Sequence, residues 1–294
     1  MSLPDPLLIV GNAVLDVLLE VGHYPREDEE MRALSRREDL GGNAANTARA
    51  LAALGHETSL LATLAPDGDG VTLRRLLAEA GVDTRHLVTA PAGRTPVSTI
   101  LLHGASRTIV HHRDLAELSA ANFTALPLER YAWVHFEGRN VAGVAAMLDH
   151  LAARGFTGRI SLEIEKDRPG LVALAARADL VLSCRAYATA KGHGEAPSLL
   201  AALGRHADRA LVTCTWGEAG AWAREADGRL HHCPAFRPER VVDTVGAGDV
   251  FNAGLIHALL AGLTPANALK EAVELAGRKV GARGYKGPEG RPAG

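Results

Sequence analysis

The chain has 294 residues, of which 47% are hydrophobic and 22% are charged, a composition typical of a globular protein with a substantial core. A formal net charge of −2 and an aromatic content of 4% argue against a nucleic-acid-binding surface. The three cysteines lie far apart, which excludes a disulfide framework and favours a reducing, cytoplasmic environment. No stretch reaches the roughly 20 apolar residues of a membrane span, and the N-terminal residues lack the pattern of a signal peptide.

Short apolar runs alternate with helix-like patterns along most of the chain. In the first half, the predicted elements are a strand at 7–10, solvated strands and turns over 15–40, an Ala-rich helix from 41–46 to 54, a strand at 59–64, a helix ending near 80, and a hairpin of 94–103 and 107–113. In the second half, they are a strand at 132–137, a helix through 152, a strand at 159–165, a short helix from Pro169, a strand at 179–183, a helical end at 199–204, a strand at 210–215, a hairpin of 219–224 and 229–232, and helices over 250–260 and 265–279. Residues 286–294 predict a frayed tail.

Strands that alternate with helices predict an α/β fold with a doubly wound, mostly parallel sheet covered by helices on both faces. Two more polar, strand-like segments, 12–40 and 94–113, interrupt this alternation. We expect these two segments to pair as a small, discontinuous β lid. The main α/β domain would then consist of residues 1–11, 41–93 and 114–294.

The stretch Val241–Leu260 carries the clearest chemical signal, because Gly246, Ala247, Gly248 and Asp249 lead into an apolar helix. The start of a helix attracts anions, and glycines let backbone N–H groups approach a phosphate. A carboxylate beside such an anion hole favours phosphoryl transfer to a hydroxyl, with Asp249 taking the proton. The alternative is an ordinary capped turn, which is common in α/β proteins. The stretch is neither a Walker A loop nor a Rossmann fingerprint.

A second glycine-rich motif strengthens this interpretation. GGNAAN at Gly41–Asn46 and DTVGAGD at Asp243–Asp249 resemble the two signatures of the ribokinase-like (PfkB) carbohydrate kinases, in the same order and over nearly the whole chain. Within that family, LDVLLEVGHYPRED, ASRTI, VHFEGRN and SLEIEK are most similar to the ketohexokinase group. The resemblance implies an ATP-dependent kinase that phosphorylates a primary hydroxyl of a ketohexose, in its sharpest form D-fructose to fructose 1-phosphate.

Two other functions stay open. One is another family kinase, acting on ribose, a fructose-phosphate, a keto-deoxy sugar acid or a nucleoside. An acidic acceptor would need extra cations in the sugar pocket, and Arg107 and Arg139 are the candidates in the sequence. The other is a sugar-binding regulator that has lost catalysis, which the intact Asp249 argues against.

The resemblance also assigns roles to individual residues. Asp249 matches the catalytic base, and the backbone of Gly246, Ala247 and Gly248 matches the anion hole. The positions matched to the sugar and the transferring phosphate are Asp16, Asp28, Gly42, Asn43, Asn46, Arg107 and Glu137. The alternatives are exposed carboxylates for Asp16 and Asp28, helix capping for Asn43 and Asn46, and a surface charge for Arg107.

The nucleotide and metal sites are also implied by the resemblance. The expected nucleotide contacts are Thr215, Gly217, Gly220, Asn252, Ala276 and Gly277, with glycines that let adenine lie against the backbone. Mg²⁺ is implied by phosphoryl transfer, with Glu165 positioning it through water, and a monovalent cation such as K⁺ could bind near Asp243. The family's Asn-x-x-Glu element is absent from 183–192.

The expected partners are a small-molecule sugar and a second copy of the chain, with no nucleic acid and no membrane. The resemblance implies a homodimer formed through the β lid. The neighbouring histidines His111 and His112, like His231 and His232, are expected to be structural or surface residues. Neighbours on a strand point to opposite faces and so cannot easily share one metal.

Overall fold

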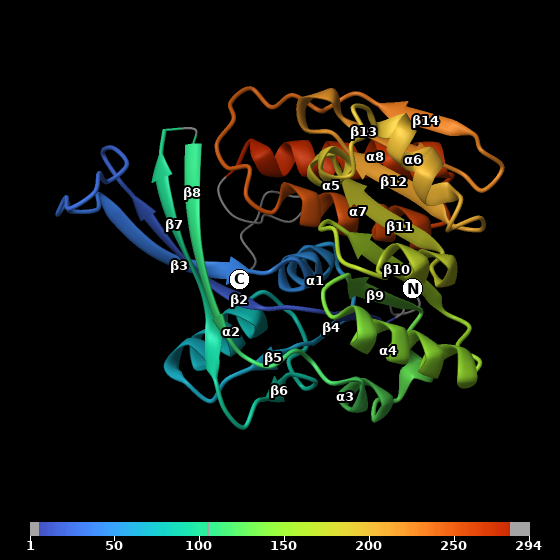
Figure 1. Cartoon of the computed structure of the whole chain (residues 1–294), viewed down its shortest axis with the longest axis horizontal. Helices are drawn as coiled ribbons and strands as arrows, with labels where there is room; N and C mark the ends of the chain where they lie inside the picture. Colours follow the sequence, from blue (N-terminus) through green and yellow to red (C-terminus); the bar gives the residue numbers. More distant parts are fainter. Residues whose placement is uncertain (1–5, 105, 283–294) are drawn as a thin grey trace.

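The computed structural model describes residues 6–104 and 106–282, so the tail predicted at 286–294 lies outside the described residues. An eight-stranded sheet forms the centre of the molecule, in the order β14-β13-β12-β11-β10-β9-β1-β4 (Figure 1). Its pairs are parallel from β4 to β12, whereas β13 and β14 are added as an antiparallel hairpin. The predicted doubly wound, mostly parallel sheet is therefore confirmed.

The strands of this sheet are β1 (Leu7–Val10), β4 (Thr58–Leu61), β9 (Trp133–Glu137), β10 (Arg159–Ile164), β11 (Leu180–Cys184), β12 (Leu211–Thr215), β13 (Ala221–Arg224) and β14 (Leu230–Cys233). The helices are α1 (Asn43–Ala53), α2 (Gly68–Glu79), α3 (Ala120–Thr124), α4 (Val141–Ala153), α5 (Arg185–Ala190), α6 (Ala196–Gly204), α7 (Ala247–Leu260) and α8 (Pro265–Val280). Short 3₁₀ segments lie at Leu128–Arg130, Val172–Arg177 and Gly217–Ala219.

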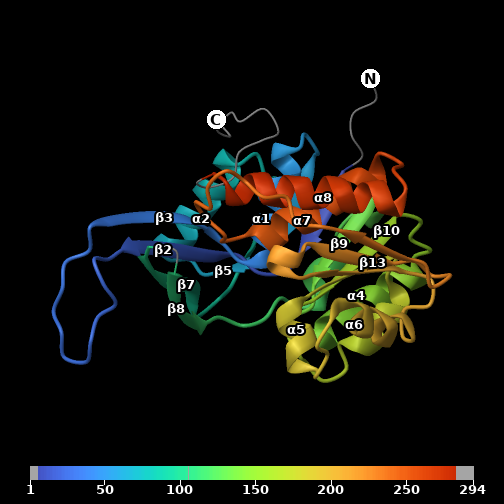
Figure 2. The ribbon, with the colours of Figure 1, turned by 90° about the horizontal axis from the view of Figure 1, so that it is seen from above.

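Two hydrophobic cores lie on the two faces of the sheet. Along β1, Leu7 and Ile9 belong to one core and Leu8 and Val10 to the other, because successive side chains of a strand point to opposite faces. Helices α1, α2, α7 and α8 cover the first face, and α3, α4, α5 and α6 cover the second (Figure 2). This arrangement leaves the carboxyl ends of the strands as one edge at which loops can gather.

A separate four-stranded sheet projects from the main body, at the left of Figure 1. It has the order β3-β2-β7-β8, formed by β2 (Val14–Glu20), β3 (Ser35–Gly41), β7 (Arg94–His103) and β8 (Ser106–Asp114). The two segments that interrupt the α/β alternation thus pair with each other, β2 lying parallel to β7. We call this sheet the lid, and we retain the division of the chain into lid and main domain as a proposal.

Several short elements differ from the sequence-based expectation. The strand predicted at 59–64 is split, since β4 ends at Leu61 and β5 (Thr63–Leu64) pairs with β6 (Val88–Thr89) in a separate small sheet. The short helix predicted to start at Pro169 is a 3₁₀ segment that begins at Val172. Helices α3 and α5 were not predicted, because segments of five and six residues are too short to show a helical period.

Candidate active site

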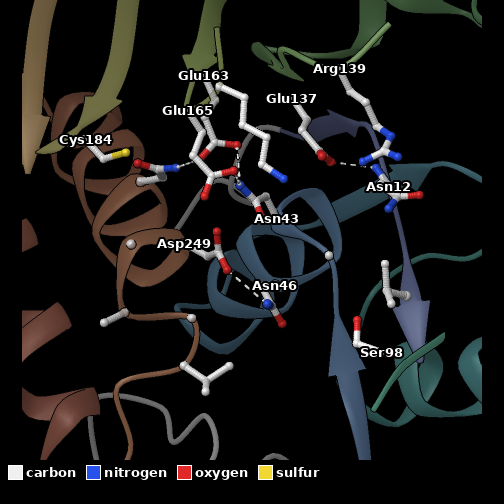
Figure 3. A pocket seen from close by; sticks show the side chains of 18 of the residues that line it. Asn12, Asn43, Asn46, Ser98, Glu137, Arg139, Glu163, Glu165, Cys184 and Asp249 are labelled. Atoms are coloured by element: carbon white, nitrogen blue, oxygen red, sulfur yellow. Dashed lines mark hydrogen bonds between the residues drawn. The ribbon is translucent and has the colours of Figure 1, made fainter. Parts of the chain in front are cut away.

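The lid and the carboxyl ends of the sheet strands enclose a cavity of about 550 Å³, which we call the central cavity (Figure 3). Its walls come from the ends of β9 to β12, the starts of α1 and α7, and the lid strands β2, β7 and β8. Many residues that the sequence nominated line this one space, although they are spread over more than 230 positions of the chain. They are Asp16, Gly42, Asn43, Asn46, Arg107, Glu137, Glu165, Thr215, Gly246, Ala247, Gly248, Asp249 and Asn252.

Asp249 lies in the first turn of α7 and faces α1 across the cavity. The Asn46 side-chain amide donates a hydrogen bond from Nδ2 to Oδ2 of Asp249, at 3.0 Å (Figure 3). Burial raises the pKa of Asp249 well above its ordinary value, and the nearby charge of Glu163 raises it further. A carboxylate with a raised pKa is a stronger base, so this position suits the removal of a proton from a hydroxyl.

Glu163, at the end of β10, is a central member of the site that the sequence reasoning missed. Its Oε2 accepts a hydrogen bond from Asn43 Nδ2 at 3.1 Å and its Oε1 accepts one from Asn252 Nδ2 at 2.9 Å. Burial and the neighbouring carboxylates raise the pKa of Glu163 to about 8. The signal was the alternation Glu163-x-Glu165 in SLEIEK, because residues two apart on a strand share a face.

The two asparagines that contact Glu163 are Asn43, on α1, and Asn252, on α7. Asn43 is not a helix cap: Gly42 is the N-cap of α1 and no side chain caps it. The Asn43 amide instead donates to Glu163 and to Glu165 Oε2, both at 3.1 Å (Figure 3). Asn252, nominated for the nucleotide, lies on the wall of the central cavity and not in the second cavity described below.

The start of α1 depends on two consecutive glycines. A Cβ added to Gly41 would lie 2.2 Å from Oδ1 of Asp16, and one added to Gly42 would lie 2.5 Å from the carbonyl oxygen of Asn12. Gly42 also has φ 89°, a conformation that favours glycine. The GGNAAN motif therefore lets the helix begin directly against the lid, which brings Asp16 and Asn46 to the same cavity.

Asp16 and Glu137 supply further buried carboxyls to the cavity wall. Asp16 is 7% exposed, and burial raises its pKa from 3.8 to about 6. Glu137, at the end of β9, accepts a hydrogen bond from the backbone N–H of Asn12 at 2.8 Å, and burial raises its pKa as well. Carboxyls whose pKa values are raised inside a cavity are typical of sites that bind or deprotonate ligands.

The loop before α7 is held by a buried ion pair. Gly246 is the N-cap of α7 in a left-handed conformation, with φ 74°. Before it, Asp243 accepts a hydrogen bond from the Val245 N–H at 2.9 Å, and its Oδ2 pairs with Lys279 Nζ at 3.0 Å. Lys279 also donates to the Asp243 carbonyl oxygen at 3.0 Å. The lysine of α8 thus fixes the loop that presents the first-turn N–H groups to the cavity.

A second cavity, of about 670 Å³, lies on the other side of this loop and shares Thr215, Thr244, Ala247 and Gly248 with the first. The other nominated nucleotide residues that line it are Gly217, Gly220, Ala276 and Gly277. At two of these positions, packing within the protein also requires a glycine. A Cβ on Gly220 would lie 2.0 Å from the Cys233 carbonyl oxygen, and one on Gly277 would lie 2.6 Å from Phe236 Cβ.

Two nominated lid residues differ in placement. Arg107 lines the central cavity and donates from Nη1 to Thr244 Oγ1 at 2.6 Å, so it joins the lid to the loop before α7. Asp28 is exposed, has φ 60°, and lines neither cavity in the single chain. The described chain alone therefore gives no contact between Asp28 and the site.

The cavity also contains cations that the sequence reasoning did not nominate. Lys166 and Arg168, which follow β10, line it together with Arg139. Arg139 is paired with Glu117 at 3.1 Å. Among the described residues, no three His, Cys, Asp or Glu side chains are grouped so as to hold a metal ion. A metal at this site would therefore need ligands from a bound nucleotide and water.

None of the helices in the described ranges has the length and apolarity needed to cross a membrane.

A family model described as pfkB family carbohydrate kinase matches residues 6–289. Ketohexokinase of Mus musculus is 37% identical over 291 residues, covering 96% of this chain and 98% of its own. The ATP-dependent ribose-1-phosphate kinase of Halopiger xanaduensis is 30% identical over 255 residues, covering 85% and 83%. The crystal structure of a candidate ribokinase from Agrobacterium tumefaciens superposes with a TM-score of 0.85 at 25% identity, covering 99% and 95%.

Proposed function

Because this chain belongs to the pfkB family of carbohydrate kinases, we propose that its acceptor is a ketohexose and that it converts D-fructose to fructose 1-phosphate. The observation that carries this proposal is the 37% identity to a ketohexokinase over nearly the full length of both chains. The family makes the chain an ATP-dependent carbohydrate kinase. The choice of sugar and the roles of individual residues are our proposals.

The geometry supports an in-line transfer at the boundary of the two cavities. ATP would lie in the second cavity, with its γ-phosphate at the start of α7, and the sugar would lie in the central cavity near Asp16 and Asn46. A sugar hydroxyl attacks the γ-phosphorus, the bond to the β–γ bridging oxygen breaks, and Asp249 takes the hydroxyl proton. The N–H groups of Gly246, Ala247 and Gly248 stabilise the negative charge on the transferred group.

The donor set suits Mg²⁺ that reaches the site with the nucleotide. Glu165 carries an exposed carboxylate on the cavity wall, and a hard oxygen ligand that leaves room for water is what Mg²⁺ prefers. When bound, Mg²⁺ supplies charge neutralisation of the phosphate oxygens. The Asp243 carboxylate already holds Lys279, so K⁺ stays a prediction, which replacing K⁺ by Na⁺ in the assay tests.

A second acceptor class has support from two observations. Lys166 and Arg168 add positive charge to the cavity, and the relative from Halopiger xanaduensis acts on ribose 1-phosphate. A phosphorylated sugar would place its anionic group near these cations. The Asp16 carboxyl and the Asn43 and Asn46 amides on the cavity wall favour an uncharged polyol, whose hydroxyls both donate and accept hydrogen bonds.

A panel of acceptors distinguishes these possibilities. ADP release is measured with D-fructose, tagatose, sorbose, ribose, fructose 6-phosphate and ribose 1-phosphate, and the product is assigned by NMR. We expect the highest kcat/KM with D-fructose and a phosphate on O1. A preference of more than tenfold for a phosphorylated acceptor would replace the proposal by the second class.

We also propose that two copies associate through the lid. Leu34, next to β3, and Val110, on β8, are 70% and 63% exposed. Sedimentation of the full chain should give the mass of a dimer, and Val110→Lys should shift it toward the monomer. An unchanged mass for Val110→Lys would place the contact elsewhere.

A further inference from the structure

Three polar side chains from neighbouring lid strands form a row across one wall of the central cavity. Asp16 on β2 pairs in register with Ser98 on β7, and Ser98 pairs with His111 on β8. Residues that are paired across adjacent strands point to the same face of the sheet. All three line the cavity, and Figure 3 shows Ser98 on this wall. We call these three residues the lid row.

Hydrogen bonds connect the lid row and determine the direction of its protons. Ser98 lies between the other two, with Oγ 3.2 Å from Nδ1 of His111 and a side-chain hydrogen bond to Asp16 that lowers the pKa of the carboxyl. An ionised carboxylate can only accept, so Ser98 uses its single proton toward Asp16. Ser98 Oγ must then accept from His111, which places the imidazole proton on Nδ1.

This tautomer leaves Nε2 of His111 as a hydrogen-bond acceptor. The hydrogen bonds found among the described residues occupy Nδ1 and leave Nε2 open. Burial lowers the pKa of His111, and the positive charges of Arg139, Arg113, Lys166 and His112 lower it further, so the ring is neutral at pH 7. A neutral acceptor on a cavity wall is suited to a sugar hydroxyl.

We propose that His111 is a sugar-binding residue and that Ser98 is its positioning residue, the lid row holding Nε2 so that it accepts a hydrogen bond from a second hydroxyl of the sugar that Asp16 binds. This inference rests on the proposed sugar site. Adjacent strands lie about 4.8 Å apart, so the backbones of Asp16 and His111 lie about 10 Å apart. Asp16 and His111 therefore accept hydrogen bonds from separate hydroxyls, so their spacing selects sugars by length.

The neighbour of His111 provides a matched control. His112 has the same side chain and follows on the same strand, but it does not line the cavity and pairs with Val97 instead of Ser98. The position of His111 on the cavity wall also revises the expectation that both histidines are structural or surface residues. The two rings do point to opposite faces, and the face of His111 is the wall of the central cavity.

Steady-state kinetics with His111→Ala, His111→Gln and His112→Ala test the binding role. His111→Ala should raise the sugar KM about tenfold and leave the ATP KM unchanged, because one hydrogen bond to the sugar is lost. His111→Gln keeps an acceptor and should recover part of this loss, whereas His112→Ala should match the wild type. An equal sugar KM for His111→Ala and His112→Ala would overturn the proposal.

Nitrogen NMR of the ¹⁵N-labelled imidazole tests the role of Ser98 and needs no sugar. The wild type should show the Nδ1–H tautomer for His111, Ser98→Ala should give a mixture of tautomers, and Ser98→Thr should restore the wild-type signal. A dominant Nε2–H tautomer in the wild type would contradict the inference. If the acceptor panel shows that another sugar is preferred to fructose, only the proposal of fructose as the acceptor is wrong. The His111 kinetics are then measured with that sugar.

Discussion

The Asn46 amide and the Asp249 carboxylate are 203 positions apart in the chain and 3.0 Å apart in the structure. Asn46 lies one turn after Asn43 on α1, and Asp249 lies one turn before Asn252 on α7. Since Asn43 and Asn252 both donate to Glu163, the two helices are joined at two levels. This closed set of contacts, which we call the helix clamp, fixes the distance between the amides proposed to bind the sugar and the proposed base.

Replacing the proposed base should remove the chemical step and leave the fold intact. Asp249→Asn keeps the size of the side chain but cannot take a proton, so we expect kcat to fall by about 10²–10⁴-fold. The ATP affinity measured by calorimetry should stay near that of the wild type. A variant with near wild-type turnover would show that another group is the base.

Gly248 should be needed for the phosphate and not for the fold. A Cβ added at this position meets no described atom within 4 Å, so Gly248→Ala should leave Tm unchanged. The added methyl would stand in the anion hole, and we expect kcat to fall by about 100-fold. Gly246→Ala is the contrasting variant, because φ 74° is strained for alanine and Tm should fall. Full activity in Gly248→Ala would move the phosphate away from this loop.

Asp16 should make sugar binding dependent on pH. Its pKa of about 6 lies above the ordinary 3.8, so the carboxyl becomes protonated as pH falls through 6 and loses the negative charge that strengthens the hydrogen bonds it accepts. The sugar KM should therefore rise below pH 6 and level off above pH 7. Asp16→Asn cannot titrate and should show a weaker but pH-independent KM. A wild-type KM that is constant from pH 5 to 8 would contradict this assignment.

Glu163 should control both the position and the titration of Asp249. The nearby charge of Glu163 raises the pKa of Asp249, so Glu163→Gln should move the acid limb of the pH–rate profile to lower pH. Glutamine can also turn its N–H₂ toward Asn43 and Asn252, which donate to Glu163, and two facing donors disturb the helix clamp. We therefore expect kcat to fall by a larger factor than the sugar KM rises. Glu165→Gln is the comparison variant: Glu165 follows β10, contacts only Asn43 of the clamp and raises the pKa of Asp249 less than Glu163 does, so the acid limb should move less.

Lys279 should contribute mainly to stability. The Lys279 side chain is 4% exposed and pairs with Asp243 at 3.0 Å, so Lys279→Met leaves a largely buried carboxylate without its cation. Breaking such a pair costs about 3–5 kcal/mol of unfolding free energy. Lys270→Met removes an exposed charge from the same helix and should have little effect. Denaturant titration of both variants measures the difference.

Most of the fold could be predicted from the sequence because its signals are local. The runs Leu7–Val10 and Leu211–Thr215 are buried strands, and Asp227-Gly228 marks the β13–β14 turn. Short elements such as α5 could not be predicted, since six residues fixed by packing against the sheet leave no periodic pattern. The break between β4 and β5 could not be predicted either, because it arises from pairing with different strands: β4 pairs with β1, and β5 pairs with β6.

The site was predicted where a motif carries its own geometry. The start of α7 with Asp249 and the start of α1 with Asn46 were both predicted, because glycines followed by an apolar or Ala-rich run indicate the start of a helix. Glu163, Ser98 and His111 were missed, since their positions depend on strand register and on which face of a sheet meets the cavity. Register between distant segments cannot be read from either segment alone.

The division of labour between the two sheets has a consequence for how such an enzyme can change. The groups proposed for proton removal and charge stabilisation are mounted at the start of α7, whereas the lid row is mounted on β2, β7 and β8. Substitutions on the inner lid face can therefore alter acceptor choice without moving the chemical machinery. If the lid row binds the sugar as proposed, laboratory evolution confined to a few lid positions should yield variants with a changed acceptor preference and an unchanged start of α7.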